Sequence, residues 1–313
     1  MLKMASQKHK DYWERRANEQ LRWVDEHDID IFDELDRIYK QEGTALKKEI
    51  FEFFDRFGTD NQMSYRESQQ ILRREDLSDY QENARRYFES AKKNPELLDR
   101  LNQQYRSARV KRMELLELDL EYRAGVINGQ INELFTVYLS QVARHIYRNA
   151  IGGHASSSLS EHTVKQLIQT PFDSYNYSQQ LWGNTDNLVK AVKEVFKKGF
   201  IRGESPRTMA QELGKQFGVA AKRAQTLIRT DGTMIINNAT AQRYADAGLK
   251  HYRILVHLDD RTTVICRRIH KENKSYLLSE YKPGVNAPPF HYNCRSTIVP
   301  DDEELNAIPV AVS

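Results

Sequence analysis

The sequence contains few cysteines, no long apolar run and no apolar segment at its N-terminus, and each absence excludes a class of protein. Two cysteines, Cys266 and Cys294, occur among 313 residues. Nowhere do about 18 apolar residues follow one another, so we expect no membrane-spanning helix. The polar N-terminus MLKMASQKHKDYWERR predicts that there is no secretory signal peptide. We therefore expect synthesis in a reducing compartment, where paired thiols are more often free or metal-bound than bridged.

A large charge of one sign is also missing. The chain has 47 basic and 44 acidic residues, a net charge of +3 and a pI of about 8.6. No global basic field therefore indicates nucleic acid. Two basic clusters, RSARVKR and KRAQTLIR, can contact phosphates, although a solvated helix face explains them as well. The sequence also lacks a P-loop pattern, a GxGxxG pattern and HExxH, so nucleotide hydrolysis and zincin chemistry have no motif.

Proline is rare in the first half of the chain, and the residue pattern there predicts helices. One proline occurs in the first 170 residues. Apolar residues recur at three- and four-residue spacings over residues 28–58, with Gly58 as the predicted stop. An Asn-Pro pair opens a second predicted helix over 95–125, and a third covers 126–152. The 29% of charged residues and the mean hydropathy of -0.73 suit elongated helices with much exposed surface.

The segment GGHASSSLSEH interrupts the helical periodicity and predicts a domain boundary. After it we expect two helices within residues 184–218, the second opened by Ser205 and closed by Gly214 or Gly218, and another helix that ends at Gly248. We expect a helical N-terminal region (1–153), a linker and docking segment (154–187), a C-terminal domain (188–300) and a tail (301–313).

The pattern changes to strands after Gly248. YRILVHL at 252–258 has branched residues and alternation, and STIVP at 296–300 predicts a second short strand, with turns between them. The predicted fold class is therefore mainly α. An elongated N-terminal helical region precedes a small α+β C-terminal domain with short strands and a Cys/His-containing loop region.

Four side chains of this C-terminal region have the spacing of a metal site. Cys266 and His270 form a C-x3-H pair, and His291 and Cys294 form an H-x2-C pair. Thiolates and imidazoles suit tetrahedral zinc, and a small, loop-rich end that buries little apolar surface would gain stability from a structural metal. The alternatives are a packed cysteine pair with histidines bonded to the backbone, and a disulfide formed on oxidation.

The same residues also permit a hydrolase hypothesis. Catalysis would need Cys294 to be activated by His291 and His291 to be oriented by Asp259 or Asp260. Two residues on one short loop rarely point at each other, and no glycine turn nearby supplies oxyanion donors. Zinc- or cysteine-dependent hydrolysis is therefore the less favoured interpretation.

Three ordered segments, IRTDGTMIINNATAQRYADAG, HLDDRTTVICRRIH and PPFHYNCRSTIVP, resemble the phage minor head protein family, the head-morphogenesis group that includes the Mu F-like proteins. The resemblance covers roughly residues 188–300. Its pattern is a helix with Arg-Thr-acid, a strand ending in Asp-x-Arg-Thr with Cys-x-x-Cys, and a terminal Pro-Pro-x-His-x-x-Cys-Arg. The matching residues are Arg229, Thr230, Asp231, Asp259 or Asp260, Arg261, Thr262, Cys266, Pro288, Pro289, His291, Asn293, Cys294 and Arg295.

One position departs from the family pattern. Thr263 stands where the family usually has the first cysteine of Cys-x-x-Cys, so a zinc site here has one thiolate fewer. His270, one turn further on, is the residue placed to replace it. For the other polar motif residues we prefer a structural role, in which Asp260 and Arg261 pair near Arg295 and pin the strand to the loop.

The resemblance implies a non-enzymatic minor head protein of a tailed phage, located inside the capsid near the portal and in the host cytoplasm during assembly. Its implied partners are the portal protein and the scaffolding or major capsid protein, and it would assist procapsid assembly or DNA packaging and ejection. The alternative is a DNA-binding protein that is packaged in the head and ejected with the genome. Some relatives carry a toxin or ADP-ribosyltransferase module after the shared domain, for which we expect no room here.

Overall fold

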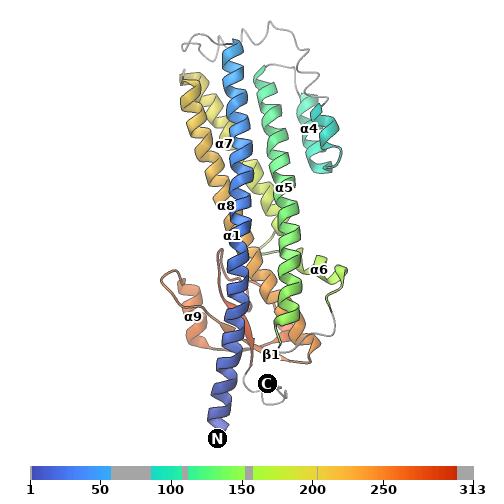
Figure 1. The fold of residues 1–313 in the computed structure, drawn as a ribbon, viewed down its shortest axis with the longest axis vertical. Coiled ribbons are helices and arrows are strands. Elements are labelled where there is room, and N and C mark those ends of the chain that lie inside the picture. The colour runs from blue at the N-terminus through green and yellow to red at the C-terminus, as the bar shows by residue number, and fades with distance from the viewer. Residues whose placement is uncertain (1, 58–85, 108–111, 152–157, 203, 302–313) are drawn as a thin grey trace. The chain divides into compact units, whose positions relative to one another are not determined.

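The protein is described from a computed structural model over residues 2–57, 86–107, 112–151, 158–202 and 204–301. These residues are mainly helical and end in a small three-stranded sheet, which confirms the predicted fold class (Figure 1). The helices are α1 (Leu2–Phe57), α4 (Pro95–Ser107), α5 (Arg112–Asn149), α6 (Glu161–Ile168), α7 (Tyr177–Arg202), α8 (Pro206–Asp246) and α9 (Val264–Glu272), with a 3-10 turn η1 (Leu278–Glu280). None of these described helices combines the length and the apolar character that a membrane span requires.

The chain folds into two compact units that interleave its segments. Unit 1 contains Met1–Phe32, Leu134–Gln180 and Gln225–Ser313, and unit 2 contains Asp33–Glu133 and Leu181–Ala224. Helices α1, α5, α7 and α8 each contribute residues to both units. The domain boundaries predicted at residues 153 and 187 therefore stay predictions. The predicted helix ends at Gly58 and Gly152 lie outside the described residues.

Two predicted helix breaks are wrong. Helix α5 runs through Gly125, because the absence of a side chain there admits Leu97 of α4, whose methyl groups occupy the place of a Cβ. Helix α8 runs through Gly214 and Gly218, since no proline follows Pro206 within it and buried residues continue at three- and four-residue spacing. The cost of about 1 kcal/mol for a helical glycine is thus outweighed by burial of the residues around it. These residues are Met209, Leu213, Phe217, Ala220, Ala221 and Ala224.

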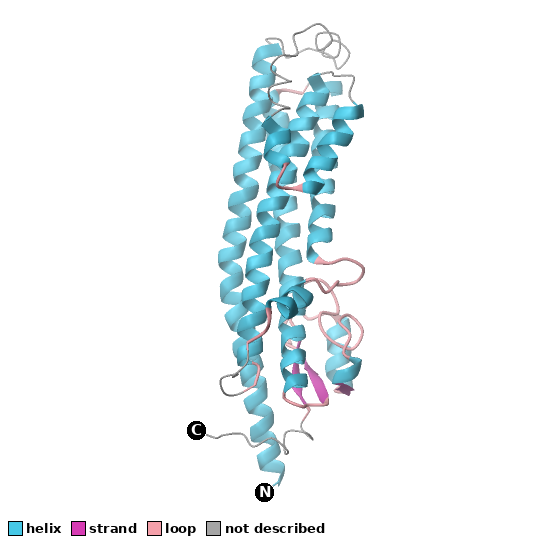
Figure 2. Cartoon of the chain, turned by 90° about the vertical axis from the view of Figure 1, so that its right-hand side faces the viewer, coloured by secondary structure: helices cyan, strands magenta, loops and turns pink. Residues whose placement is uncertain are grey.

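The C-terminal sheet, whose strands are magenta in Figure 2, is antiparallel and has the order β2-β1-β3. Its strands are β1 (His251–Leu255), β2 (Ser275–Leu277) and β3 (Thr297–Pro300), so both predicted strands are confirmed, whereas β2 and α9 were not predicted. Gly248 ends the preceding helical segment with a φ of 80°, as its position predicts.

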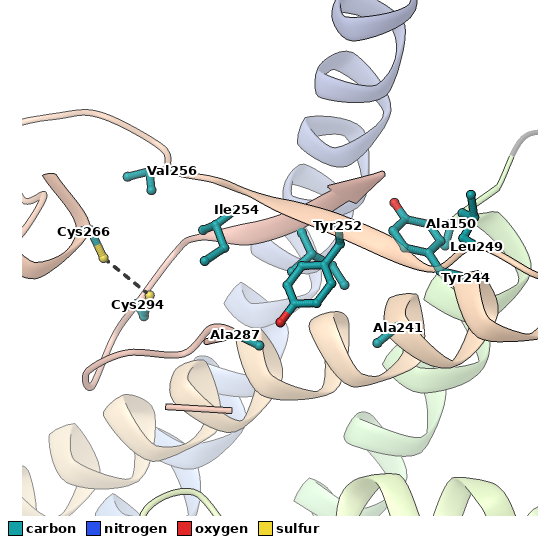
Figure 3. Packing of buried hydrophobic residues seen from close by; sticks show 11 residues of the cluster. Ala150, Ala241, Tyr244, Leu249, Tyr252, Ile254, Val256, Cys266, Ala287 and Cys294 are labelled. Atoms are coloured by element: carbon teal, nitrogen blue, oxygen red, sulfur yellow. Dashed lines mark hydrogen bonds between the residues drawn. The ribbon is translucent and has the colours of Figure 1, made fainter. Parts of the chain in front are cut away.

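The sheet does not form an isolated end but packs with helices of unit 1 in one buried cluster. Tyr252 and Ile254 alternate on the buried face of β1, and the register places Ile254 opposite Ile298 of β3. Figure 3 shows Tyr252 and Ile254 directed toward α8, where Ala241 and Tyr244 belong to the same cluster. We expected the C-terminal end to bury little apolar surface, but α8 provides apolar area against which the sheet packs.

Candidate metal centre and signature motifs

Cys266 lies in the first turn of α9, on the face that packs into the core. Thr263 is the N-cap of the helix, and its hydroxyl oxygen accepts a hydrogen bond of 3.4 Å from the Cys266 N–H. The helix ends at Asn273, which has a left-handed φ of 41°. Because Ile269 follows one turn after Cys266 and packs against the same cluster, the helix fixes the direction of the Cys266 thiol.

Cys294 and His291 lie in the loop before β3. The Cys294 N–H donates to the His291 carbonyl at 3.2 Å, and the intervening Asn293 has a φ of 58°, a conformation that asparagine tolerates. The imidazole Nδ1 of His291 lies 2.8 Å from the carbonyl oxygen of Tyr292. Donation from Nδ1 to this carbonyl leaves the Nε2 lone pair available, which is the tautomer that a metal ligand requires.

Three of the four predicted ligands converge. The Cys266 Sγ lies 3.2 Å from the His291 Nε2 and 3.9 Å from the Cys294 Sγ (Figure 3), and all three donor atoms lie within 4.8 Å of one another. Tetrahedral zinc with Zn–S bonds of about 2.3 Å separates two thiolates by about 3.8 Å. The donor set and its spacing therefore fit zinc through Cys266, His291 and Cys294.

The two thiols are coupled by a hydrogen bond of 3.9 Å. This hydrogen bond lowers the pKa of Cys294 to about 6, and backbone N–H groups of Phe290 and Ser296 add to the effect. The same hydrogen bond, together with burial, raises the pKa of Cys266. Near neutral pH the pair thus provides one thiolate, and a metal ion that binds both sulfurs displaces the second proton.

The fourth ligand is not supplied by His270. Its side chain is exposed on α9, and within the described ranges no further Cys, His, Asp or Glu joins the cluster. Thr263, which stands at the position of the family's missing cysteine, is occupied as the helix cap. The chain therefore offers a Cys2His set, and a bound zinc ion would take its fourth ligand from outside this set.

The geometry of the loop does not assemble the hydrolase constellation. The His291 Nε2 faces Cys266, and its Nδ1 faces a backbone carbonyl rather than a carboxylate. Asp259 is paired with Arg295, and Cys294 is 1% exposed. Among the described residues, neither Asp259 nor Asp260 therefore orients the imidazole toward the thiol.

A row of polar side chains on α8 holds the loop that carries Cys294. The Thr230 hydroxyl accepts from the Asn293 N–H at 3.0 Å, and the Thr233 hydroxyl donates to the Cys294 carbonyl at 2.6 Å. The Asn237 Nδ2 donates to the Ser296 carbonyl at 3.2 Å. These three α8 residues, which we call the polar ladder (Thr230, Thr233, Asn237), are spaced by three and four positions and are buried. They satisfy backbone groups that would otherwise be buried without partners.

Arg229 and Asp231 flank Thr230 but point to different surroundings. The Arg229 guanidinium lies 4.6 Å from the ring centroid of Phe32 on α1 and 3.9 Å from a carboxylate oxygen of Asp28. Asp28 also accepts a 2.5 Å hydrogen bond from the Tyr138 hydroxyl, yet burial raises its pKa to about 6. We call the three segments that resemble the family, IRTDGTMIINNATAQRYADAG, HLDDRTTVICRRIH and PPFHYNCRSTIVP, the signature segments. Arg229 thus links the first signature segment, on α8, to α1 within unit 1.

Asp231 is enclosed in the interior. It is 1% exposed, and neither carboxylate oxygen has a hydrogen-bond partner among the described residues. Burial raises its pKa to about 8, so the side chain is a neutral acid at pH 7.

The second and third signature segments are joined by an ion pair. Arg295 pairs with Asp259, which lowers the pKa of Asp259 to about 2. Arg261 lies 3.6 Å from the same Asp259 carboxylate. The acid that both arginines approach is thus Asp259 and not Asp260, which we expected to pair with Arg261 near Arg295; Asp260 is exposed. Thr262 closes the turn, since its hydroxyl donates to the His257 carbonyl at 3.0 Å and accepts from the Asp259 N–H at 2.7 Å.

Pro288 and Pro289 precede the loop, are buried and are joined by a cis peptide bond. Of the residues that hold this region together, sequence reasoning missed Thr233 and Asn237. Their only signal is the spacing of polar residues by three and four positions on an otherwise apolar helix.

A family model matches the C-terminal part of the chain. Residues 190–299 match the family model described as Phage Mu protein F like protein. Neither the curated proteins nor the solved structures gave a match. The matched residues include all three signature segments except Pro300, so the recognition from their residues is confirmed. Residues 190–299 are a Mu F-like segment, and the chain is accordingly similar to phage head morphogenesis proteins of that family.

Proposed function

We propose that the protein is a non-enzymatic minor head protein of a tailed phage, which lies inside the capsid near the portal and assists procapsid assembly or DNA packaging and ejection. Its proposed partners are the portal protein and the scaffolding or major capsid protein. The family match over residues 190–299 supports the phage head assignment. The observation that carries the non-enzymatic role is that the signature residues hold backbone segments in place.

Contacts in each signature segment support this anchoring role. Thr230 of the first segment holds the loop of the third, and Arg295 of the third pairs with Asp259 of the second. The thiols of Cys266 and Cys294 are free and buried, and they are hydrogen-bonded to each other. A substrate would need access to at least one of these groups, so their engagement supports a role in building a stable binding module.

The experiment is deletion of the gene in a phage that carries it, followed by electron microscopy of the heads. We expect few full heads and a large loss of infectious particles, both restored by the wild-type gene. Normal numbers of full, infectious particles without a copy of the protein inside would refute the proposal.

Complementation with Cys294→Ser separates anchoring from catalysis. A structural role predicts that this variant loses thermal stability and complements only as far as it folds. Asp260→Asn, a change at an exposed position, serves as the matched control and should complement fully. A Cys294→Ser protein with wild-type stability and wild-type abundance in heads, but without infectivity, would instead indicate catalysis.

A further inference from the structure

Helix α9 exposes an apolar and basic face opposite to the side that it buries. Cys266 and Ile269 face the core, and the turn of about 100° per residue places Val264, Arg268 and Lys271 on the opposite side. Val264 is 83% exposed, although transfer of an aliphatic side chain out of water is favourable. Ile265, on the flank of this face, is 41% exposed.

The charges around this face are predominantly positive. The Arg268 side chain is 71% exposed and lies 3.9 Å from Glu272, a distance and an exposure at which an ion pair contributes little. Lys271 is exposed as well. Over residues 257–274 five basic side chains oppose three acidic ones, so the segment has a net charge of +2. The basic residues are Arg261, Arg267, Arg268, Lys271 and Lys274, and the acidic ones are Asp259, Asp260 and Glu272.

The helix that carries this face is held firmly. The Thr263 cap fixes its first turn, and the Arg267 guanidinium donates to the backbone carbonyls of Thr262 at 3.2 Å and Asp259 at 2.9 Å. Its inner face is fixed by Cys266 in the core. A partner therefore meets a preformed surface and does not have to order it on binding.

We infer that this face, the α9 surface (Val264, Ile265, Arg268, Lys271), binds an acidic segment of a partner protein that inserts an aliphatic side chain between the two charges. The inference rests on the proposed function, because it assigns the contact through which the protein joins other head proteins. Arginine is enriched among the residues that dominate the affinity of protein interfaces, and burial of the exposed Val264 side chain by a partner would add a favourable hydrophobic contribution. A phosphate backbone would neutralise the charges but leave Val264 and Ile265 in water, so protein chemistry fits this face better than DNA.

The test uses complementation of the deleted gene and counts copies of the protein in purified heads. Val264→Asp and the double variant Arg268→Glu/Lys271→Glu should each reduce the copy number about tenfold or more, since loss of one central contact changes affinity on this scale. Val285→Asp, at an aliphatic residue that is 66% exposed elsewhere in unit 1, and Lys165→Glu, at an exposed basic residue, are the matched controls and should be incorporated normally. Thermal melting of each purified variant verifies that it folds.

The outcomes distinguish the surface from the function. Wild-type protein absent from heads would overturn the proposed function, whereas wild-type and all variants present in equal numbers would overturn the α9 surface alone. An effect of Val264→Asp without an effect of the charge reversal would overturn the acidic character of the partner. A benzophenone side chain at position 264 should crosslink in assembling heads to an acidic segment of another head protein. Crosslinks to DNA or to a second copy of this chain would overturn the inference.

Discussion

Replacement of Asp231 by asparagine should stabilise the protein, and the gain should grow with pH. In the folded protein burial raises the pKa of Asp231 to about 8, from 3.8 for an exposed aspartate. Between these two values the unfolded chain is ionised while the folded protein keeps the proton. The free energy of unfolding of the wild type therefore falls as the pH rises from about 4 to about 8 and is level above that range. The asparagine variant has no proton to lose at this position and is free of this dependence.

The magnitude follows from the pKa difference. One pKa unit corresponds to about 1.4 kcal/mol, so about 3 units at pH 7 give about 4 kcal/mol and the full shift gives about 6 kcal/mol above pH 8. Residual structure in the unfolded chain reduces these values, and we expect a measured gain of at least about 2 kcal/mol at pH 8. Near pH 4 the two proteins should be equally stable, because asparagine and protonated aspartate have nearly the same shape.

The assay is urea unfolding of wild type and Asp231→Asn, followed by far-UV circular dichroism at pH 4, 6 and 8. Asp260→Asn is the control, since Asp260 is exposed and its replacement should leave both the midpoint and its pH dependence unchanged. If Asp231→Asn is less stable than the wild type at pH 8, or if the two proteins lose stability in parallel as the pH rises, then Asp231 has an ionic partner and the reasoning is refuted.

Three further changes test the packing and the metal centre. Thr233→Val leaves the Cys294 carbonyl buried without its donor and should lower the free energy of unfolding in urea by about 1–3 kcal/mol. Thr233→Ser keeps the hydroxyl and should largely avoid this loss. A valine variant as stable as the wild type would contradict the role of the polar ladder. Gly125→Ala forces a methyl group against Leu97 of α4 and should lower the free energy of unfolding by about 1–3 kcal/mol. Gly183→Ala, at a helical glycine with nothing within 4 Å, should raise it by up to about 1 kcal/mol. The reverse order would contradict the contact between Gly125 and α4. Thr263→Cys adds a thiolate beside the Cys2His set and should tighten zinc binding at least about tenfold. Competition with a chromophoric chelator measures the affinity. An unchanged affinity would place the fourth ligand elsewhere.

The sequence predicted the class of the fold because helical periodicity and branched strand residues are local signals. The strands at Tyr252 and Ile298 and the stop at Gly248 are such cases. Gly125 and Gly214 misled the prediction, since a glycine inside a helix reads as a break unless the neighbouring helix that uses or tolerates the small residue is known.

The cluster of candidate ligands was predicted only in part, for a reason of geometry. Spacing along the chain suggested both His270 and His291, but the direction of a side chain on a helix depends on which face is buried. Burial of Cys266 and Ile269 turns His270 to solvent, and only the fold shows which face that is. The choice between Asp259 and Asp260 had the same origin, because adjacent residues of a turn point in different directions.

The hydrogen bonds from α8 to the loop before β3 have a consequence for how a metal ion would be exchanged. Thr230, Thr233 and Asn237 hold that loop through groups that are separate from the sulfur and imidazole donors. An ion that bound here would therefore not have to organise its own site, in contrast to small zinc domains that are unfolded without metal. Chelation should leave the helical circular dichroism and the thermal midpoint nearly unchanged, so that zinc could enter or leave a finished protein as a separable ligand.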